Sequence, residues 1–108
     1  MSYGKNRLLI QTLHECVEAC NYCFQACLKE ENVKMMTECI RLDRECADMC
    51  TFLERELTID SPFAHDLAEI CSKICEACGN ECQKHEHDHC QECAKSCFKC
   101  AKACKDIA

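Results

Sequence analysis

The sequence predicts an all-α fold, an antiparallel up-down-up-down four-helix bundle with a cysteine-lined core. Only 2 Gly and 1 Pro occur among 108 residues, so few residues oppose helix formation. The 16 cysteines recur at steps of three and four residues, which return a side chain to the same face of an α-helix. The cysteine-bearing stretches are joined by short connections, which make neighbouring helices antiparallel. We expect residues 1–108 to form a single domain.

The first two predicted helices meet at a polar turn. The first helix runs from near Ser2 or Lys5 to Glu30, and the second runs from about Asn32 to Leu57. The acidic and amide residues at their junction form the turn, because they interrupt the apolar pattern.

A break at residues 58–62 separates the second helix from the third. Ser61 is a candidate N-cap, and Pro62 suits the first helical position, where its missing N–H costs nothing. The third helix then runs to about Lys84. Gly79 costs about 1 kcal/mol relative to Ala within a helix. We nevertheless place Gly79 in the helix interior, because the cysteine pattern continues past it.

The fourth predicted helix begins near Asp88 and ends at about Asp106. Asp88 can cap the helix, with Gln91 three residues later as its partner in a capping box. This helix completes the bundle.

Cysteine stripes define the predicted core. Three stretches share separations of 4, 3 and 4 residues, and a fourth has a carboxylate, Asp43, in the second position. Each stripe spans about 16 Å of helix, so four of them line a common tube. Asp43 is expected to break the array or to hydrogen-bond to thiols. The stripes are formed by Cys16, Cys20, Cys23 and Cys27; by Cys39, Cys46 and Cys50; by Cys71, Cys75, Cys78 and Cys82; and by Cys93, Cys97, Cys100 and Cys104, with Cys90 three residues before the last group.

A tube of thiols favours a soft metal ion, with Cu(I) as the leading candidate. Thiolates can bridge two metals, so the capacity is on the order of one copper per cysteine. Zinc prefers isolated tetrahedral sites and suits a shared array less well. An iron–sulfur or thiol redox protein remains an alternative, as does a single-copper chaperone. Because 16 stacked ligands indicate capacity, we expect a storage protein and not an enzyme.

The two ends of the predicted tube differ in their side chains. Leucines seal one end and continue the stripes there, namely Leu9, Leu13, Leu53, Leu57 and Leu67. Soft or borderline metal ligands lie at the other end, which we predict to be the copper entrance: Met35, Met36, His85, His87 and His89. The leucine end holds the layer Cys16, Cys50, Cys71 and Cys104, and the entrance holds the layer Cys27, Cys39, Cys82 and Cys90.

Charge and hydropathy exclude several classes of protein. The net charge of -6 argues against nucleic acid binding, which requires a basic surface. No apolar run approaches the roughly 18 residues that span a bilayer, so no membrane association is expected. The polar start, Met1 to Arg7, lacks the features of a secretory signal. We therefore predict a cytoplasmic protein, in which structural disulfides are disfavoured.

Two segments resemble the cytosolic branch of the bacterial copper storage proteins. They are Cys39–Cys50 and Ile74–Cys82, the latter followed by the His-rich turn to Cys90. The resemblance implies a homotetramer of four-helix bundles filled with Cu(I) on cysteine thiolates, with all 16 cysteines as ligands and the Met and His residues at the mouth. It identifies no copper donor or acceptor protein. Apolar residues outside the stripes, such as Leu28 and Phe52, are candidates for the subunit interface.

Overall fold

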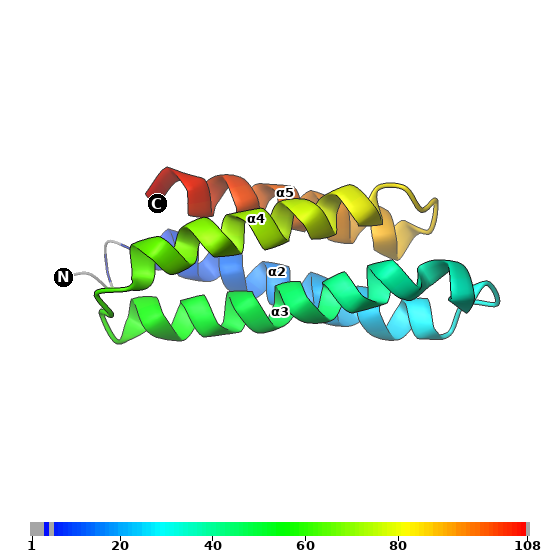
Figure 1. Cartoon of the computed structure of the whole chain (residues 1–108), viewed down its shortest axis with the longest axis horizontal. Coiled ribbons are helices and arrows are strands. Elements are labelled where there is room, and N and C mark those ends of the chain that lie inside the picture. The colour runs from blue at the N-terminus through cyan, green and yellow to red at the C-terminus, as the bar shows by residue number, and fades with distance from the viewer. Residues whose placement is uncertain (1–3, 5, 108) are drawn as a thin grey trace.

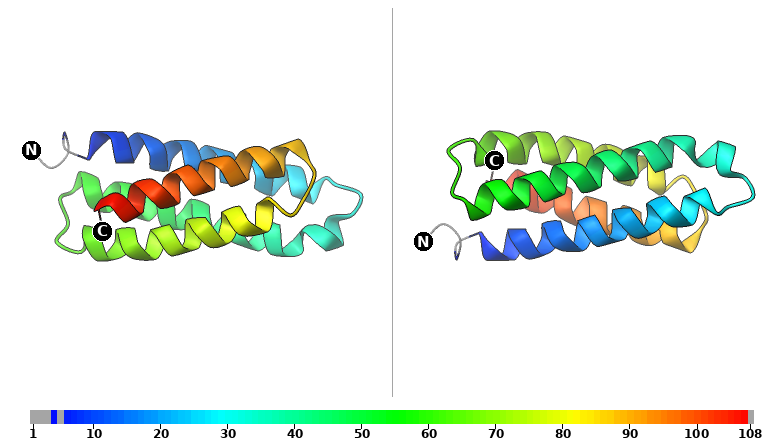
Figure 2. Two further views of the ribbon diagram at one scale, coloured as in Figure 1. Left: turned by 90° about the horizontal axis from the view of Figure 1, so that it is seen from above. Right: turned by 90° about the horizontal axis from the view of Figure 1, so that it is seen from below.

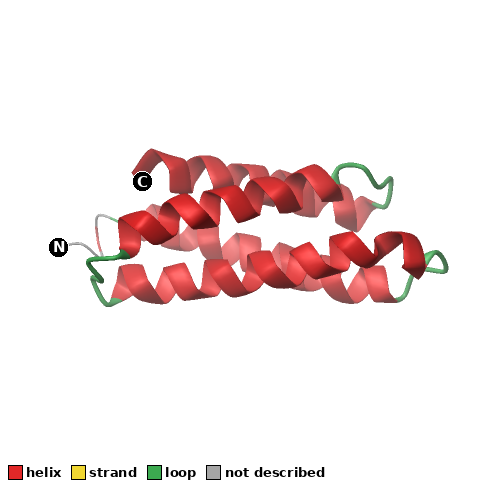
Figure 3. Cartoon of the chain, in the orientation of Figure 1, coloured by secondary structure: helices red, strands yellow, loops and turns green. Residues whose placement is uncertain are grey.

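The structure is a computed structural model that describes residue 4 and residues 6–107. Within this part of the chain, four long α-helices and one short 3-10 helix follow one another, and Figures 1 and 3 show the long helices lying side by side. The predicted all-α four-helix fold is confirmed. The predicted helix starts at Ser2 and Lys5 lie outside the described residues. The elements are α2 (Arg7–Leu28), η1 (Val33–Met36), α3 (Thr37–Thr58), α4 (Ala64–Cys82) and α5 (Asp88–Ile107).

The helices form an elongated square bundle with extents of 48 × 18 × 18 Å. Helices α2 and α4 each pack against both α3 and α5, so all four surround one central axis. The α2–α3 and α4–α5 connections lie together at one end of this axis, which we call the mouth end (Figures 1 and 2). The α3–α4 connection and the C-terminal end of α5 lie at the opposite end, which we call the leucine end.

The buried face of each helix explains why the bundle closes. In all four helices the buried residues recur at steps of three and four, so each helix presents one continuous stripe to the axis. Every cysteine of the chain lies on these stripes and is buried. A buried thiol packs as a small apolar group, so the cysteines serve as the hydrophobic core of the metal-free protein.

The leucine end is closed by larger apolar side chains. Leu67 is only half-buried there. The burial of the other four leucines confirms that apolar side chains close this end. They are Leu9, Leu13, Leu53 and Leu57.

The second helix starts later than predicted. Residues 29–32 form a turn, residues 33–36 form η1, and α3 begins at Thr37 instead of Asn32. The 3-10 turn adjusts the direction of the chain before the α-helix starts, a common use of this conformation.

Helix α3 ends in a left-handed residue. Asp60 has a φ of 57°, and the N–H of Ser61 donates to the carbonyl of Glu56 at 2.9 Å. This is the Schellman arrangement, which satisfies carbonyls that the helix end leaves free. Aspartate is one of the few non-glycine residues that tolerate this conformation.

The predicted start of the third helix is wrong by two residues. Ser61 Oγ accepts a hydrogen bond from the N–H of Phe63 at 3.1 Å, which makes a local turn, and α4 begins at Ala64. Ser61 therefore shapes the connection and does not cap the helix, because the serine side chain competes for a nearby N–H. The helix ends at Cys82, two residues before the predicted Lys84.

Gln91 has a different role from the one predicted. Asp88 is the first residue of α5, and the helix ends at Ile107, one residue beyond the prediction. The Gln91 side-chain amide donates to the carbonyl of Gln83 at 3.1 Å and to the carbonyl of His85 at 2.6 Å. It therefore closes the α4–α5 turn and makes no capping box.

Gly79 lies inside α4, as predicted, and is buried. The ring of Phe98 in α5 lies directly against it. A Cβ at this position would be 2.7 Å from Phe98 Cε1 and 2.9 Å from Cδ1. Glycine permits the close packing of α4 and α5 at this point, which compensates for its low helix propensity.

Candidate metal centre

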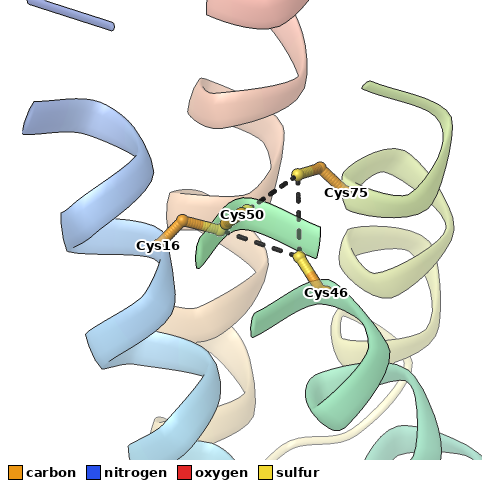
Figure 4. Close-up of side chains that lie close together, drawn as sticks. All are labelled: Cys16, Cys46, Cys50 and Cys75. Carbon is orange, nitrogen blue, oxygen red and sulfur yellow. Dashed lines mark hydrogen bonds between the residues drawn. The ribbon is translucent and has the colours of Figure 1, made fainter. Parts of the chain in front are cut away.

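Groups of four thiols occupy the interior of the bundle. In the group drawn in Figure 4, Cys16 comes from α2, Cys46 and Cys50 from α3, and Cys75 from α4, and all four side chains point toward one another. The sulfur of Cys46 lies 3.8 Å from that of Cys16 and 3.6 Å from that of Cys75. The sulfur of Cys50 lies 3.7 Å from that of Cys75. Three helices thus contribute to a single cluster of soft ligands.

Successive groups share members, so the thiols form a continuous column. In each group the ligand atoms all lie within 4.8 Å of one another. A shared sulfur can bridge two Cu(I) ions, whereas isolated tetrahedral zinc sites do not need to share ligands. Beyond the group of Figure 4, the column includes Cys16, Cys20, Cys46 and Cys97; Cys20, Cys78, Cys93 and Cys97; Cys23, Cys27, Cys39 and Cys90; and Cys23, Cys39, Asp43 and Cys82.

The predicted layer at the mouth end is present. The sulfur of Cys39 lies 3.3 Å from that of Cys82 and 3.9 Å from that of Cys27. The sulfur of Cys27 is also 3.9 Å from that of Cys90. These four cysteines from four different helices form the outermost layer of the column.

Two members of the layer predicted at the leucine end lie together. The sulfurs of Cys50 and Cys71 are 3.8 Å apart, and Cys104 is fully buried. Cys16 shares the group of Figure 4 with Cys50, so Cys50 contacts both Cys71 and the group that contains Cys16.

A column of buried, adjacent thiols cannot lose all of its protons in the metal-free protein. Burial, followed by the interaction with the nearby Cys39, raises the pKa of the Cys27 thiol to about 12. A column of adjacent thiolates would also repel itself in a medium of low dielectric constant. Metal binding must therefore displace protons, because the metal takes the thiolate form.

Asp43 is buried among thiols, as the sequence allowed. Its Oδ1 accepts hydrogen bonds from Cys78 and Cys93 at 3.4 Å and from Cys82 at 3.5 Å. Burial, with the neighbouring Cys93 and Cys39 acting in the same direction, raises the pKa of this carboxyl to about 10. The expectation that Asp43 hydrogen-bonds to thiols is confirmed, and at neutral pH the carboxyl is uncharged.

His89 lies against the column at the mouth end. Its Nδ1 is 3.5 Å from the sulfurs of Cys23 and Cys90 and 3.8 Å from that of Cys27. Its Nε2 lies 2.8 Å from Glu30 Oε2. The side chain is only 11% exposed. One imidazole nitrogen thus joins three sulfurs in a compact group of potential ligands.

The other predicted mouth residues have different surroundings. His87 stacks on His89 with ring centroids 5.2 Å apart, and His85 Nε2 pairs with Glu81 Oε2 at 2.9 Å. Met36 is fully buried, whereas Met35 is 72% exposed. The structure brings His89 to the thiols and directs His85 toward a carboxylate and Met35 toward solvent.

Two carboxylates at the mouth were not recognised from the sequence. Glu30 was assigned to the polar turn, and Glu81 was given no role. Glu30 lies three residues after Cys27 in the chain, and its carboxylate contacts the imidazole of His89, which is 59 residues away. Glu81 lies at i−4 from His85, a spacing that allows side-chain contact when both residues are helical or nearly so. That spacing was a usable signal for Glu81, whereas the contact of Glu30 depends on the tertiary fold.

A four-helix bundle whose interior is a column of shared, reduced thiols defines a container for soft metal ions. A family model described as copper storage protein matches residues 3–108. The chain belongs to the copper storage protein family, which confirms the resemblance seen in the sequence.

Relatives from two genera support this assignment. The uncharacterized cysteine-rich protein YhjQ of Bacillus subtilis (strain 168) is 51% identical over 85 residues, which cover 79% of each chain. Cu(I)-bound copper storage protein BsCsp3 and apo copper storage protein 3 from Bacillus subtilis are each 48% identical, with TM-scores of 0.92 and 0.91. They cover 95% of this chain, which in turn covers 97% and 98% of theirs.

The second group of relatives comes from Streptomyces lividans. One structure of its copper storage protein is loaded with 10 copper equivalents. A second structure contains five coppers and describes the protein as a cytosolic copper storage protein. Both are 36% identical to this chain, with a TM-score of 0.89. The matches cover 92% of this chain and 80% and 88% of the two Streptomyces chains, respectively. Within the described residues, no helix combines the length and the apolar character needed to cross a bilayer.

Proposed function

We propose that this protein stores Cu(I) in the cytosol, with many ions held in each chain by the thiolates of its 16 cysteines. The observation that carries this proposal is the continuous column of buried free thiols, in which neighbouring groups share sulfurs. Sharing allows the number of metal ions to approach the number of ligands. The copper-loaded relatives and their cytosolic description support the same function and location.

The mouth residues form the second part of the proposed ligand set. His89 is the best placed of them, because its Nδ1 lies beside three thiols. Met36 is a buried candidate, and Met35, His85 and His87 are outer candidates for transient binding. Imidazole and thioether hold Cu(I) less strongly than thiolate, so an ion at the mouth would pass on to the column.

Storage in this bundle exchanges protons for metal with little change of fold. The metal-free column is already packed and buried, so Cu(I) enters a preformed site. Each ion replaces thiol protons, and the positive charge of the metal offsets the negative charge of the thiolates. Release then requires a competing ligand or protons, and not unfolding.

The assembly is part of the proposal. We infer one domain over residues 1–108 that acts in binding and storage, not in catalysis, and assembles as a homotetramer. The family resemblance supports the tetramer, as do large apolar side chains at the surface. They include Leu8 (76% exposed), Tyr22 (63%), Leu28 (51%), Phe52 (37%), Phe63 (64%) and Ile70 (48%).

Anaerobic titration of the reduced protein with Cu(I) tests the storage function directly. Against a competing Cu(I) chelator, we expect saturation at many ions per chain, on the order of one per cysteine. Saturation at one or two equivalents would favour a copper chaperone instead. A visible charge-transfer band after treatment with iron and sulfide, together with weak copper binding, would favour an iron–sulfur protein.

Replacing His89 by alanine is expected to slow copper loading while the total capacity stays nearly unchanged. The imidazole borders the outermost thiols, and all 16 cysteines remain in the variant. Stopped-flow mixing with a Cu(I) donor measures the rate, and the chelator titration measures the capacity. His14, which is 65% exposed and pairs with Glu54, provides the matched His14→Ala control. Equal loading rates for the two variants would contradict entry at the mouth end.

A further inference from the structure

Glu30 connects the end of α2 to the histidines that begin α5. Its Oε2 lies 2.8 Å from His89 Nε2 and 3.5 Å from His87 Nδ1. Its own N–H donates to the carbonyl of Cys27 at 3.2 Å, which ties the backbone of Glu30 to a residue of the outermost thiol layer. The Glu30 side chain is 28% exposed, which leaves it partly shielded from water.

The contact with Glu30 determines which nitrogen of His89 can bind metal. A carboxylate only accepts hydrogen bonds, so the nitrogen facing it carries the proton. The other nitrogen of a neutral imidazole then presents a lone pair. Here Nε2 faces Glu30, and the lone pair of Nδ1 faces the sulfurs of Cys23, Cys27 and Cys90.

The stacked His87 ring strengthens this arrangement. Its plane lies within 6° of the His89 plane, and it approaches the same oxygen of Glu30. One carboxylate therefore restrains two imidazoles, and the ring of His87 limits rotation of the ring of His89. A rotated His89 would present a protonated nitrogen to the thiols and could not act as a ligand.

We propose that Glu30 is the positioning residue of the mouth. It sets the tautomer and the orientation of His89, so that Nδ1 and three thiols receive incoming Cu(I). Glu30 acts through His89 and does not bind the metal itself. Such carboxylate–imidazole pairs raise the basicity of a ligand and hold its orientation, and their loss commonly weakens metal handling 10- to 100-fold. This inference rests on the storage function proposed above.

The tautomer of His89 is measured first, in the metal-free protein. Long-range nitrogen–proton NMR of the imidazole rings should show His89 with Nε2 protonated and Nδ1 unprotonated. In the Glu30→Gln variant the side chain keeps its shape, but an amide can donate as well as accept. We expect a mixture of both tautomers in that variant, and the original tautomer in Glu30→Asp, which retains an acceptor-only group.

Loading kinetics test the functional consequence. The first phase of Cu(I) loading should slow by roughly 10-fold in Glu30→Gln, with partial recovery in Glu30→Asp and unchanged total capacity. Glu31→Gln removes the same charge from the next residue, which is exposed, and should load like the wild type. In a His89→Ala background, the Glu30→Gln substitution should have no further effect.

Three results would overturn the proposal. The first is a single unchanged His89 tautomer in Glu30→Gln, and the second is equal slowing by Glu31→Gln, which would indicate general attraction of cations by negative charge. The third is persistence of the Glu30→Gln effect without His89. Wild-type protein that fails to bind many Cu(I) ions would instead reject the storage function, so the two failures are distinguishable.

Discussion

Replacing Asp43 by asparagine is expected to stabilise the metal-free protein at pH 7 by roughly 2–4 kcal/mol. The carboxyl is fully buried, and its pKa rises from 3.8 to about 10 in the folded protein. Folding at pH 7 therefore requires this group to take up a proton, which costs about 4 kcal/mol. Asparagine has nearly the same shape, needs no proton, and still offers an oxygen to the thiols of Cys78, Cys82 and Cys93.

The same reasoning predicts the pH dependence. Between the unfolded pKa of 3.8 and the folded pKa of about 10, the folded state binds one more proton at Asp43 than the unfolded state. Stability must therefore fall as the pH rises through this window, by about 1.4 kcal/mol per pH unit from this group alone. The Asp43→Asn variant should lose that part of the slope.

Urea unfolding of the reduced proteins between pH 5 and pH 8 measures both effects. Asp48, on the same helix, is 71% exposed and pairs with Arg44, so Asp48→Asn is the control and should change stability by less than about 0.5 kcal/mol. An Asp43→Asn variant with the stability and slope of the wild type would show that Asp43 is ionised in the folded protein.

Replacing Gly79 by alanine is expected to destabilise the protein by about 1–3 kcal/mol. Helix propensity alone predicts the opposite, a gain of about 1 kcal/mol. The added methyl group would lie 2.7 Å from the ring of Phe98, so the ring must move or α4 and α5 must separate. Overpacking at this contact therefore outweighs the gain in propensity.

Two further substitutions isolate this contact. In a Phe98→Ala background the obstacle is absent, so Gly79→Ala should become stabilising by up to about 1 kcal/mol. Asn80→Ala, at the exposed neighbour on the same helix, should be neutral or slightly stabilising in either background. Thermal or urea unfolding of the four Gly79 and Phe98 combinations gives the coupling energy. A coupling energy near zero would contradict the packing account.

Local sequence determined the fold class and the composition of the core. Steps of three and four residues place the cysteines of each stretch on one helical face, and short polar connections make successive helices antiparallel. These are local properties, so the four helices, the buried cysteines and the sealed leucine end follow from them. The helix ends around Ser61 and Asn32 were less predictable, because a hydroxyl or a 3-10 turn can end or delay a helix by several residues.

Tertiary structure alone decided which residues meet across the bundle. The sequence treats Met35 and Met36 alike, yet one is exposed and the other fully buried, because successive side chains of the 3-10 helix η1 point about 120° apart. Glu30 and His89 are 59 residues apart in the chain. Their contact requires α2 and α5 to end and begin at the same level. The amino-acid sequence is therefore sufficient to predict a thiol-lined four-helix bundle that binds soft metal. The contacts at the mouth and the raised pKa of Asp43 depend on distances between separate helices, so only the packing of the helices sets them.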